Sequence, residues 1–194
     1  RRRERGALKT YDAIVVGARC AGATLALQLA RGGLRVVVVD RDPPGSDTVS
    51  THVIFPNTLD RLHRLGLLDR LRAQHDLPSL GYSWRSGVHE VAGTFTPVGG
   101  FDRASCVRRT VLDATLAQAA QDAGAEIRRG TGVRRLVGRG TADDPVRGVQ
   151  LDDGAELAAP WVFGADGRAS TVARHVAASR RDERRGEQAF LFAY

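Results

Sequence analysis

The sequence has one lysine, no methionine and two cysteines. Lys9 is the only lysine among 29 basic residues, so almost all of the formal net charge of +7 comes from arginine. The arginines are scattered and are not interleaved with aromatic residues, which is the pattern of a biased composition. Nucleic-acid binding needs a clustered basic face, so we do not expect a nucleic-acid partner.

The two cysteines exclude two kinds of site. Cys20 and Cys106 form no C-x-x-C pair and have no clustered histidines beside them, so neither a disulfide framework nor a zinc site is predicted. Long apolar runs are also missing, because no stretch approaches the roughly 20 residues that span a bilayer. We therefore expect a soluble, cytoplasmic protein without a membrane partner.

Methionine is absent even from position 1. The basic residues 1–7 lead directly into a strand pattern without the apolar stretch of a secretory signal, so we expect a basic arm there. A chain of 194 residues holds one domain, or one and a fraction.

The first forty residues predict a β-α-β unit. Residues 11–16 are a short apolar run rich in β-branched side chains, and residues 21–30 follow as a helix-forming stretch. Residues 34–39 are uniformly apolar, which is typical of a parallel strand covered on both faces. Such a unit commonly binds a nucleotide at the turn between its first strand and its helix.

That turn has the sequence GARCAG. Gly17 and Gly22 occupy the first and third glycine positions of G-x-G-x-x-G, where they allow a tight turn and close packing of helix on strand. Arg19 stands where the second glycine belongs. Two alternatives remain for its side chain: it neutralises bound phosphates, or it faces solvent.

The segment after the turn completes a predicted dinucleotide site. A pyrophosphate would rest at the N-terminus of the helix that begins near Cys20 or Ala21. Asp40 ends the second strand, 23 positions after Gly17, where a carboxylate accepts hydrogen bonds from a ribose hydroxyl. A carboxylate at this position also disfavours a phosphate on the ribose, although the neighbouring Arg41 weakens that exclusion.

The rest of the chain predicts short helices and strands. The helix that begins at Thr110 is expected to open with a capping box that includes Asp113 and to end at Gly124. Further helices are predicted around residues 59–65, 67–71 and 170–177. Strands are predicted within 82–96 and at 126–128, 132–138, 146–151, 155–159, 161–165 and 190–194. The strand at 161–165 is expected to be buried, and Asp153-Gly154 predicts a hairpin turn between the strands at 146–151 and 155–159.

Three motifs, taken in order, resemble a known family. They are the Gly17 to Gly22 turn with Asp40, the run from Arg109 to Asp113, and the GADGRASTVAR run of residues 164–174. Together they are similar to the FAD-dependent monooxygenases of the aromatic hydroxylase type, the single-component group related to p-hydroxybenzoate hydroxylase. The resemblance covers nearly the whole chain, although the last arginine, Arg174, comes one residue later than in the strict motif.

The resemblance implies a fold and a domain division. The expected class is α/β: a Rossmann-like FAD-binding domain with a β-meander, plus the beginning of a β-rich substrate-binding lobe. Residues 8–78 and 104–178 would form the FAD-binding domain, and residues 79–103 and 186–194 would form part of the substrate lobe. Residues 1–7 would be the arm.

The resemblance also implies FAD as cofactor and NAD(P)H as reductant, with few catalytic side chains, because the cofactor supplies the chemistry. Thr51 and His52 would lie beside the flavin ring, and Arg109 near the flavin or its phosphates. The predicted cofactor-binding residues are Gly17, Ala18, Arg19, Cys20, Ala21, Gly22, Asp40, Arg41, Thr51, His52, Arg109, Val133, Asp166 and Gly167. No catalytic side chain and no metal ligand is predicted.

The function implied is hydroxylation of a small aromatic or polyketide-like molecule. A further Gly-Asp motif of the family does not follow Arg174, so we expect a fragment that binds FAD poorly and turns over nothing alone. The alternatives are a flavin-dependent reductase of the geranylgeranyl reductase type and a non-catalytic dinucleotide-binding module. A flavin halogenase is less favoured because that group needs an active-site lysine, and the only lysine here, Lys9, precedes the first predicted strand. A basic DNA-binding protein is the last alternative.

Overall fold

The structure, a computed structural model, describes residues 9–179. The chain divides into two compact units: unit 1 comprises Arg1–Pro44 and Ala120–Tyr194, and unit 2 comprises Gly45–Ala119. The domain division inferred from the sequence stays a prediction. Its arm at 1–7 and its segment at 186–194, with the strand expected at 190–194, lie outside the described residues.

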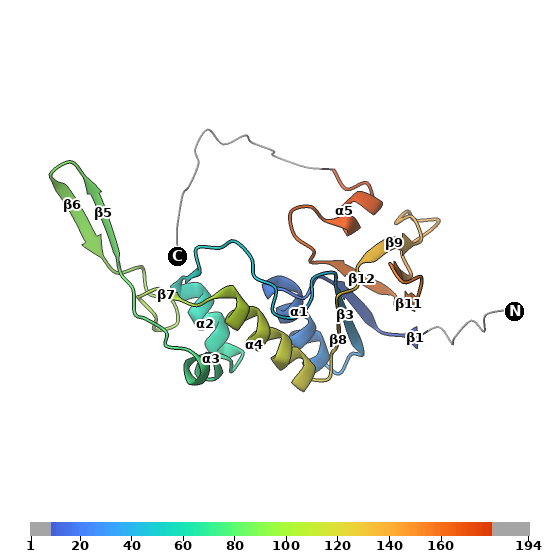
Figure 1. The fold of residues 1–194 in the computed structure, drawn as a ribbon, viewed down its shortest axis with the longest axis horizontal. Coiled ribbons are helices and arrows are strands. Elements are labelled where there is room, and N and C mark those ends of the chain that lie inside the picture. Colours follow the sequence, from blue (N-terminus) through green and yellow to red (C-terminus); the bar gives the residue numbers. More distant parts are fainter. Residues whose placement is uncertain (1–8, 180–194) are drawn as a thin grey trace, which may run out of the picture. The chain divides into compact units, whose positions relative to one another are not determined.

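A parallel sheet forms the centre of unit 1 (Figure 1). Its strand order is β12 (Trp161–Gly164), β2 (Ala13–Val16), β3 (Val36–Asp40) and β8 (Glu126–Arg129). The helix α1 (Cys20–Arg31) connects β2 to β3 and contacts both strands. The predicted β-α-β unit is therefore confirmed, and all five residues of β3 are buried, as its uniformly apolar sequence predicts.

A second sheet of unit 1 contains the predicted meander. Strands β9 (Val133–Val137), β10 (Gly148–Leu151) and β11 (Glu156–Ala158) are antiparallel neighbours, and β1 (Lys9–Thr10) runs parallel to β11. Gly154, with φ +87°, lies in the turn between β10 and β11.

The core of unit 1 follows from the alternation of side chains along its strands. Ile14, Val16, Val37 and Val39 form one buried cluster with four side chains of the meander sheet, Leu136, Val149, Leu151 and Leu157. The alternate residue Val15 faces α1, because its Cγ1 lies next to Gly22 of that helix. Helix, parallel sheet and meander are thus three stacked layers, and each fully buried valine contributes roughly 1.5–3 kcal/mol.

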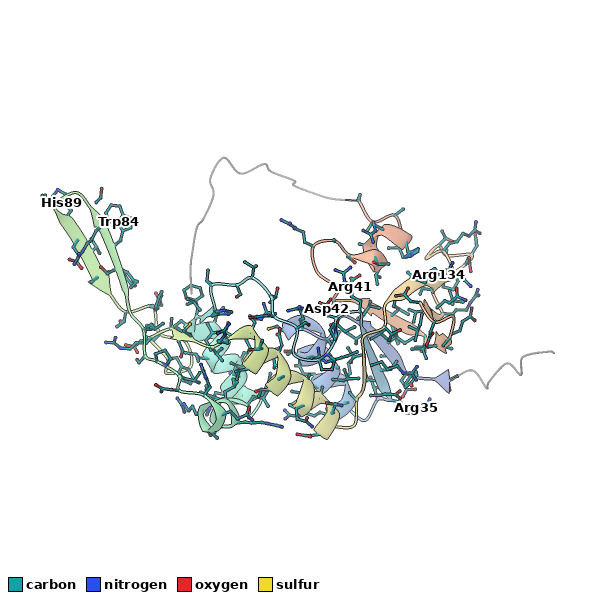
Figure 2. All side chains as sticks on the ribbon, viewed as in Figure 1. Arg35, Arg41, Asp42, Trp84, His89 and Arg134 are labelled. Carbon is teal, nitrogen blue, oxygen red and sulfur yellow. The ribbon has the colours of Figure 1, made fainter. Side chains whose placement is uncertain are left out.

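Unit 2 consists of short helices, a small strand pair and an extended hairpin. Its helices include α2 (Pro56–Arg64) and α3 (Leu68–Gln74), and the chain turns between these two at Gly66, whose φ is +71°. Strand β4 (Val53–Ile54) pairs with β7 (Ser105–Cys106). Strands β5 (Tyr82–Ser86) and β6 (His89–Gly93) form the hairpin, which bears the labelled Trp84 and His89 (Figure 2).

Two expectations about individual elements are wrong. Helix α4 (Arg109–Asp122) begins at Arg109, and the carboxylate of Asp113 accepts hydrogen bonds from the Arg109 guanidinium at 3.1–3.3 Å instead of belonging to a capping box with Thr110. Strand β12 is not buried, because it is an edge strand of the described sheet. The side chain of Trp161 is accordingly 66% exposed.

Helices of the described residues are also short. Within residues 9–179, no helix combines the length and the apolar composition that crossing a membrane requires.

An exposed ion pair joins the starts of β2 and β3 and makes the free energy of unfolding depend on pH. The Arg35 guanidinium and backbone N–H donate to Asp12, and these bonds hold the pKa of that carboxyl below its ordinary value of 3.8. Because the folded-state pKa is lowered, the stabilisation is present above that value and is lost as the pH falls below it.

We expect the free energy of unfolding in urea to fall between about pH 5 and about pH 2. The fall should be shallower in Asp12→Asn, by a small margin because the pair is exposed. The same pH slope in both proteins would show that this pair does not contribute.

Candidate functional site

Unit 1 contains a pocket of about 440 Å³ at the carboxyl ends of its parallel strands. Strands β2, β3 and β12 end at Val16, Asp40 and Gly164, and the loops that follow them line the pocket. Eight of the fourteen predicted cofactor-binding residues lie in this lining: Gly17, Arg19, Ala21, Asp40, Arg41, Val133, Asp166 and Gly167.

The turn after β2 needs glycine at two of its three motif positions. Gly17 has φ +102°, and a Cβ there would lie 2.5 Å from the carbonyl oxygen of Ala165. A Cβ on Gly22 would collide with the carbonyl oxygen of Gly17. Position 19 has φ −85° and ψ −169°, which is extended backbone open to any residue. Arg19 therefore leaves the turn intact.

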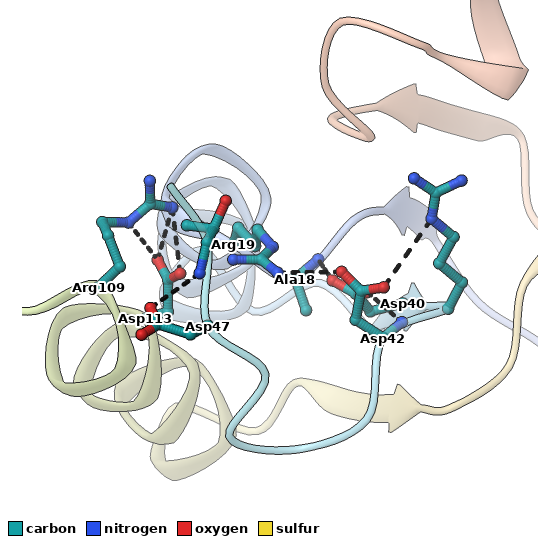
Figure 3. Close-up of polar contacts among 9 residues, drawn as sticks. Ala18, Arg19, Asp40, Asp42, Asp47, Arg109 and Asp113 are labelled. Carbon is teal, nitrogen blue, oxygen red and sulfur yellow. Dashed lines mark hydrogen bonds and ion pairs between the residues drawn. The ribbon is translucent and has the colours of Figure 1, made fainter. Parts of the chain in front are cut away.

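Asp40 ties this turn to the end of β3. Its buried carboxylate accepts the backbone N–H of Ala18 at 2.6 Å on Oδ2 and that of Asp42 at 2.8 Å on Oδ1 (Figure 3). A carboxylate oxygen has two lone pairs, so both oxygens retain acceptor capacity. Asp40 thus shapes the turn and can also accept a ligand hydroxyl.

Arg19 and Asp42 both line the pocket, and their side chains form an ion pair. Nη2 of Arg19 lies 3.0 Å from Oδ2 of Asp42, and the side chains are 27% and 39% exposed (Figure 3). Nε of Arg41 lies 4.0 Å from Oδ1 of the same carboxylate. The guanidinium therefore does not simply face solvent, and its partner, Asp42, is a residue that the sequence analysis did not select.

The loop after β12 forms another part of the wall. Asp166 accepts hydrogen bonds at 2.6 Å from the Ser170 hydroxyl and from the Thr171 backbone N–H, at the start of helix α5 (Thr171–His175). Gly167 has φ +78°. The Asp166 carboxylate thus fixes the loop against α5, while the Gly167 backbone lines the pocket.

The segment that enters β9 closes the other side. Asp152 accepts the backbone N–H of Gly132 at 3.1 Å and donates its own N–H to the Gly132 carbonyl at 3.1 Å. A Cβ on Gly132 would collide with that carboxylate. The predicted residue Val133 follows directly, so Asp152 and Gly132 hold it beside the pocket.

Seven lining residues were not predicted from the sequence: Val16, Val39, Asp42, Gly132, Asp152, Ala165 and Thr171. Asp42 follows Asp40 by two positions, and Asp152 precedes the predicted hairpin turn, so the only available signal was an acidic residue at a strand end. Three further predicted residues, Ala18 in the turn and Cys20 and Gly22 at the start of α1, are not part of the described lining.

The remaining predicted residues belong to unit 2. Thr51 is exposed, whereas His52 is buried, with φ +60°, and its carbonyl accepts the backbone N–H of Val107 at 2.9 Å. A positive φ is uncommon for residues other than glycine, so the backbone at this position carries strain. Arg109 pairs with Asp113 on the same helix (Figure 3). The roles of Thr51, His52 and Arg109 at a flavin stay predictions.

The pocket has the features that an adenosine diphosphate group needs. In the described chain, no side chain caps the N-terminus of α1, and no acidic residue lies in its first turn, so its dipole can act on an anion. Asp40 offers acceptor oxygens for a ribose. The volume also lies within the range of small-molecule sites. The residues present therefore fit the ADP half of a dinucleotide.

Comparison with known proteins gives a consistent result. Residues 10–191 match the family described as "FAD binding domain". The chain is 32% identical over 162 residues to a rifampicin monooxygenase of Rhodococcus hoagii, which covers 83% of this chain and 32% of that protein. It is also 32% identical over 166 residues to a menaquinone reductase of Mycolicibacterium smegmatis, which covers 84% of this chain and 39% of that protein.

Solved structures show the same fold. A crystal structure of mutant PqsL from P. aeruginosa matches with a TM-score of 0.76 at 21% identity, covering 92% of this chain and 48% of that one. At that identity the likeness is one of fold. The chain spans about a third to two fifths of the length of the two relatives.

Proposed function

Because the chain belongs to the FAD binding domain family, we propose that the unit 1 pocket holds the ADP half of FAD in a flavin-dependent monooxygenase. The observation that carries the proposal is the convergence of the Gly17 turn, Asp40 and Gly167 on one pocket. The similarity to a rifampicin monooxygenase supports the reaction class.

Each part of the pocket has a distinct binding role in this proposal. The N-terminus of α1 and the Gly167 backbone bind the pyrophosphate, since backbone N–H groups and the helix dipole favour negative charge. Asp40 accepts from the ribose, and the backbone at Val133 contacts the adenine. Thr51, His52 and Arg109 of unit 2 are proposed to bind the flavin half.

The chemistry of the reaction belongs to the cofactor: bound FAD supplies electron transfer and oxygen activation. The residues of this chain bind it, orient it and limit its exposure to water. NAD(P)H is proposed as the reductant, and the substrate of the whole protein as a small aromatic or polyketide-like molecule. Residues 79–103 are proposed to belong to the substrate lobe, and the cytoplasm is the proposed location.

A flavin-dependent reductase is the second candidate, and the similarity to a menaquinone reductase favours it. The two candidates share the ADP site and differ in the fate of oxygen. A monooxygenase transfers an atom of O₂ into its product, whereas a reductase does not. Isotope-labelled oxygen in the product of the whole protein would support the monooxygenase, and an unlabelled reduced product would support the reductase.

Calorimetric titration of the 194-residue chain with FAD, ADP, NAD and FMN tests the proposal. We expect FAD to bind with a Kd in about the micromolar range and NAD at least about tenfold more weakly. ADP should bind, because the pocket takes that half of the cofactor. FMN lacks the adenosine and should bind much more weakly than FAD.

Other relative affinities for these four compounds would favour a different function or contradict the proposal. Equal affinities for NAD and FAD would favour a non-catalytic dinucleotide-binding module. Equal affinities for FMN and FAD would contradict the assignment of the pocket to the ADP half. A chain that binds none of the four compounds would contradict the proposed function.

A further inference from the structure

Arg19, at the middle position of the glycine-rich turn, has no role among the binding roles described above, although its side chain is held by a hydrogen bond to Asp42. Since the backbone at Arg19 is extended, the residue is not forced to be glycine, and this lining residue bonds through its guanidinium to Asp42, which also lines the pocket. Arg19 immediately precedes the helix α1, whose N-terminus attracts an anion.

The partner of Arg19 is itself rigidly held. The backbone N–H of Asp42 donates to Asp40 at 2.8 Å, and its carbonyl accepts the N–H of Gly130 at 3.2 Å. Its carboxylate accepts from Nη2 of Arg19 at 3.0 Å. A backbone fixed at both ends thus presents one carboxylate oxygen to Arg19, while Nε of Arg41 lies 4.0 Å from the other oxygen.

The other carboxylates of the pocket are engaged by backbone donors. Asp40 accepts from Ala18 and Asp42, Asp152 accepts from Gly132, and Asp166 accepts from Thr171. Asp42 differs because a cationic side chain is its hydrogen-bond donor. A guanidinium has five N–H donors, so the bond to Asp42 does not use its whole donor capacity.

We propose that Arg19 binds the diphosphate of the ligand and that Asp42 is a positioning residue that holds the guanidinium in place. The inference rests on the proposed function, since it concerns the same pocket. Where glycine occupies the second motif position, the backbone alone binds the phosphates. In this turn, the charged side chain of Arg19 supplies part of that binding. Holding the guanidinium before binding reduces the entropy lost when the ligand arrives.

The test compares ADP with adenosine, which lacks the phosphates, by calorimetric titration of the full 194-residue chain. Arg19→Ala should weaken ADP binding at least about tenfold, as expected for a lost charge-assisted hydrogen bond, and leave adenosine within about twofold. The loss should shrink as salt rises from about 0.05 M to about 0.3 M. Arg19→Lys should restore part of the affinity, because it returns the charge without the fork.

The sign of the Asp42→Asn effect separates positioning from simple repulsion. With Arg19 present, Asp42→Asn should weaken ADP binding about threefold, because the guanidinium loses its anchor. In the Arg19→Ala background the same change should strengthen ADP binding, because only repulsion of the diphosphate remains. The matched control is the exposed pair Asp12 and Arg35 of the same unit, whose variants Asp12→Asn and Arg35→Ala should change neither affinity.

Four results would overturn the inference. Tighter ADP binding by Asp42→Asn with Arg19 present would make Asp42 a merely repelling charge. Equal losses for ADP and adenosine in Arg19→Ala would indicate a structural effect, which a lowered melting temperature would reveal independently. If the wild-type protein binds FAD and every variant binds ADP with the wild-type affinity, the inference about Arg19 is wrong and the proposed function stands. If the wild-type protein binds neither FAD nor ADP, both the inference and the proposed function are wrong.

Discussion

Gly22→Ala should nearly abolish binding of ADP and FAD and strongly destabilise unit 1. A Cβ on Gly22 would collide with the carbonyl oxygen of Gly17 and press on Cγ1 of Val15, so α1 must move away from β2. Overpacking of this kind costs about 3 kcal/mol of unfolding free energy. If the displacement removes two hydrogen bonds to the diphosphate, affinity falls about a hundredfold.

The matched control for this substitution is Gly33→Ala. Gly33 also lies in unit 1 and has φ +82°, but no atom lies within 4 Å of its added Cβ. We expect it to lower the free energy of unfolding by about 1 kcal/mol through backbone strain and to leave the ADP affinity unchanged. Urea unfolding and calorimetry measure the two effects, and equal losses of affinity in both variants would contradict a local role for Gly22.

Asp40→Ala should be comparably severe. The carboxylate is buried and accepts two backbone N–H groups, from Ala18 and Asp42. A buried donor left without an acceptor costs about 1–3 kcal/mol, so the free energy of unfolding should fall by about 2–5 kcal/mol. ADP affinity should fall about a hundredfold, because the ribose acceptor and the shape of the turn are lost together.

Asp40→Asn separates these contributions. It retains one acceptor oxygen but turns the other position into a donor that faces a backbone N–H, so binding should fall between wild type and Asp40→Ala. Adenosine binding should fall along with ADP binding, in contrast to Arg19→Ala, because the ribose is common to both ligands. Unchanged adenosine binding in Asp40→Ala would show that this carboxylate does not contact the ribose.

The fold of unit 1 was predictable because its sequence signals are local. The uniformly apolar β3 predicts burial on both faces, and Asp153 with Gly154 predicts the hairpin between β10 and β11; both agree with the structure. The start of α4 was not predictable in the same way. Thr110 and Asp113 have capping-box spacing, but the Arg109 guanidinium captures the carboxylate, and a local pattern does not reveal such competition.

The residues of the candidate site also divide into those that the local sequence predicts and those that depend on contacts between distant segments. Gly17, Gly22 and Asp40 follow from the geometry that a β-α-β turn imposes on its own sequence. Asp152 meets Gly132 across 20 residues, and Arg19 meets Asp42 across 23 residues. These pairs depend on how distant segments meet at the ends of the strands, and no periodicity encodes that arrangement. The positions of Thr51, His52 and Arg109 relative to a flavin are predictions of the same long-range kind.

Nuclear magnetic resonance titration of the isotope-labelled chain tests the central claim, that the unit 1 pocket binds the ADP half of FAD, most directly. The proposal predicts saturable shifts of backbone amide signals at Arg19, Ala21, Val133 and Gly167 on addition of ADP, reproduced at the same residues by FAD. Saturable shifts confined to residues outside this pocket, or no shifts at all with either ligand, would contradict it.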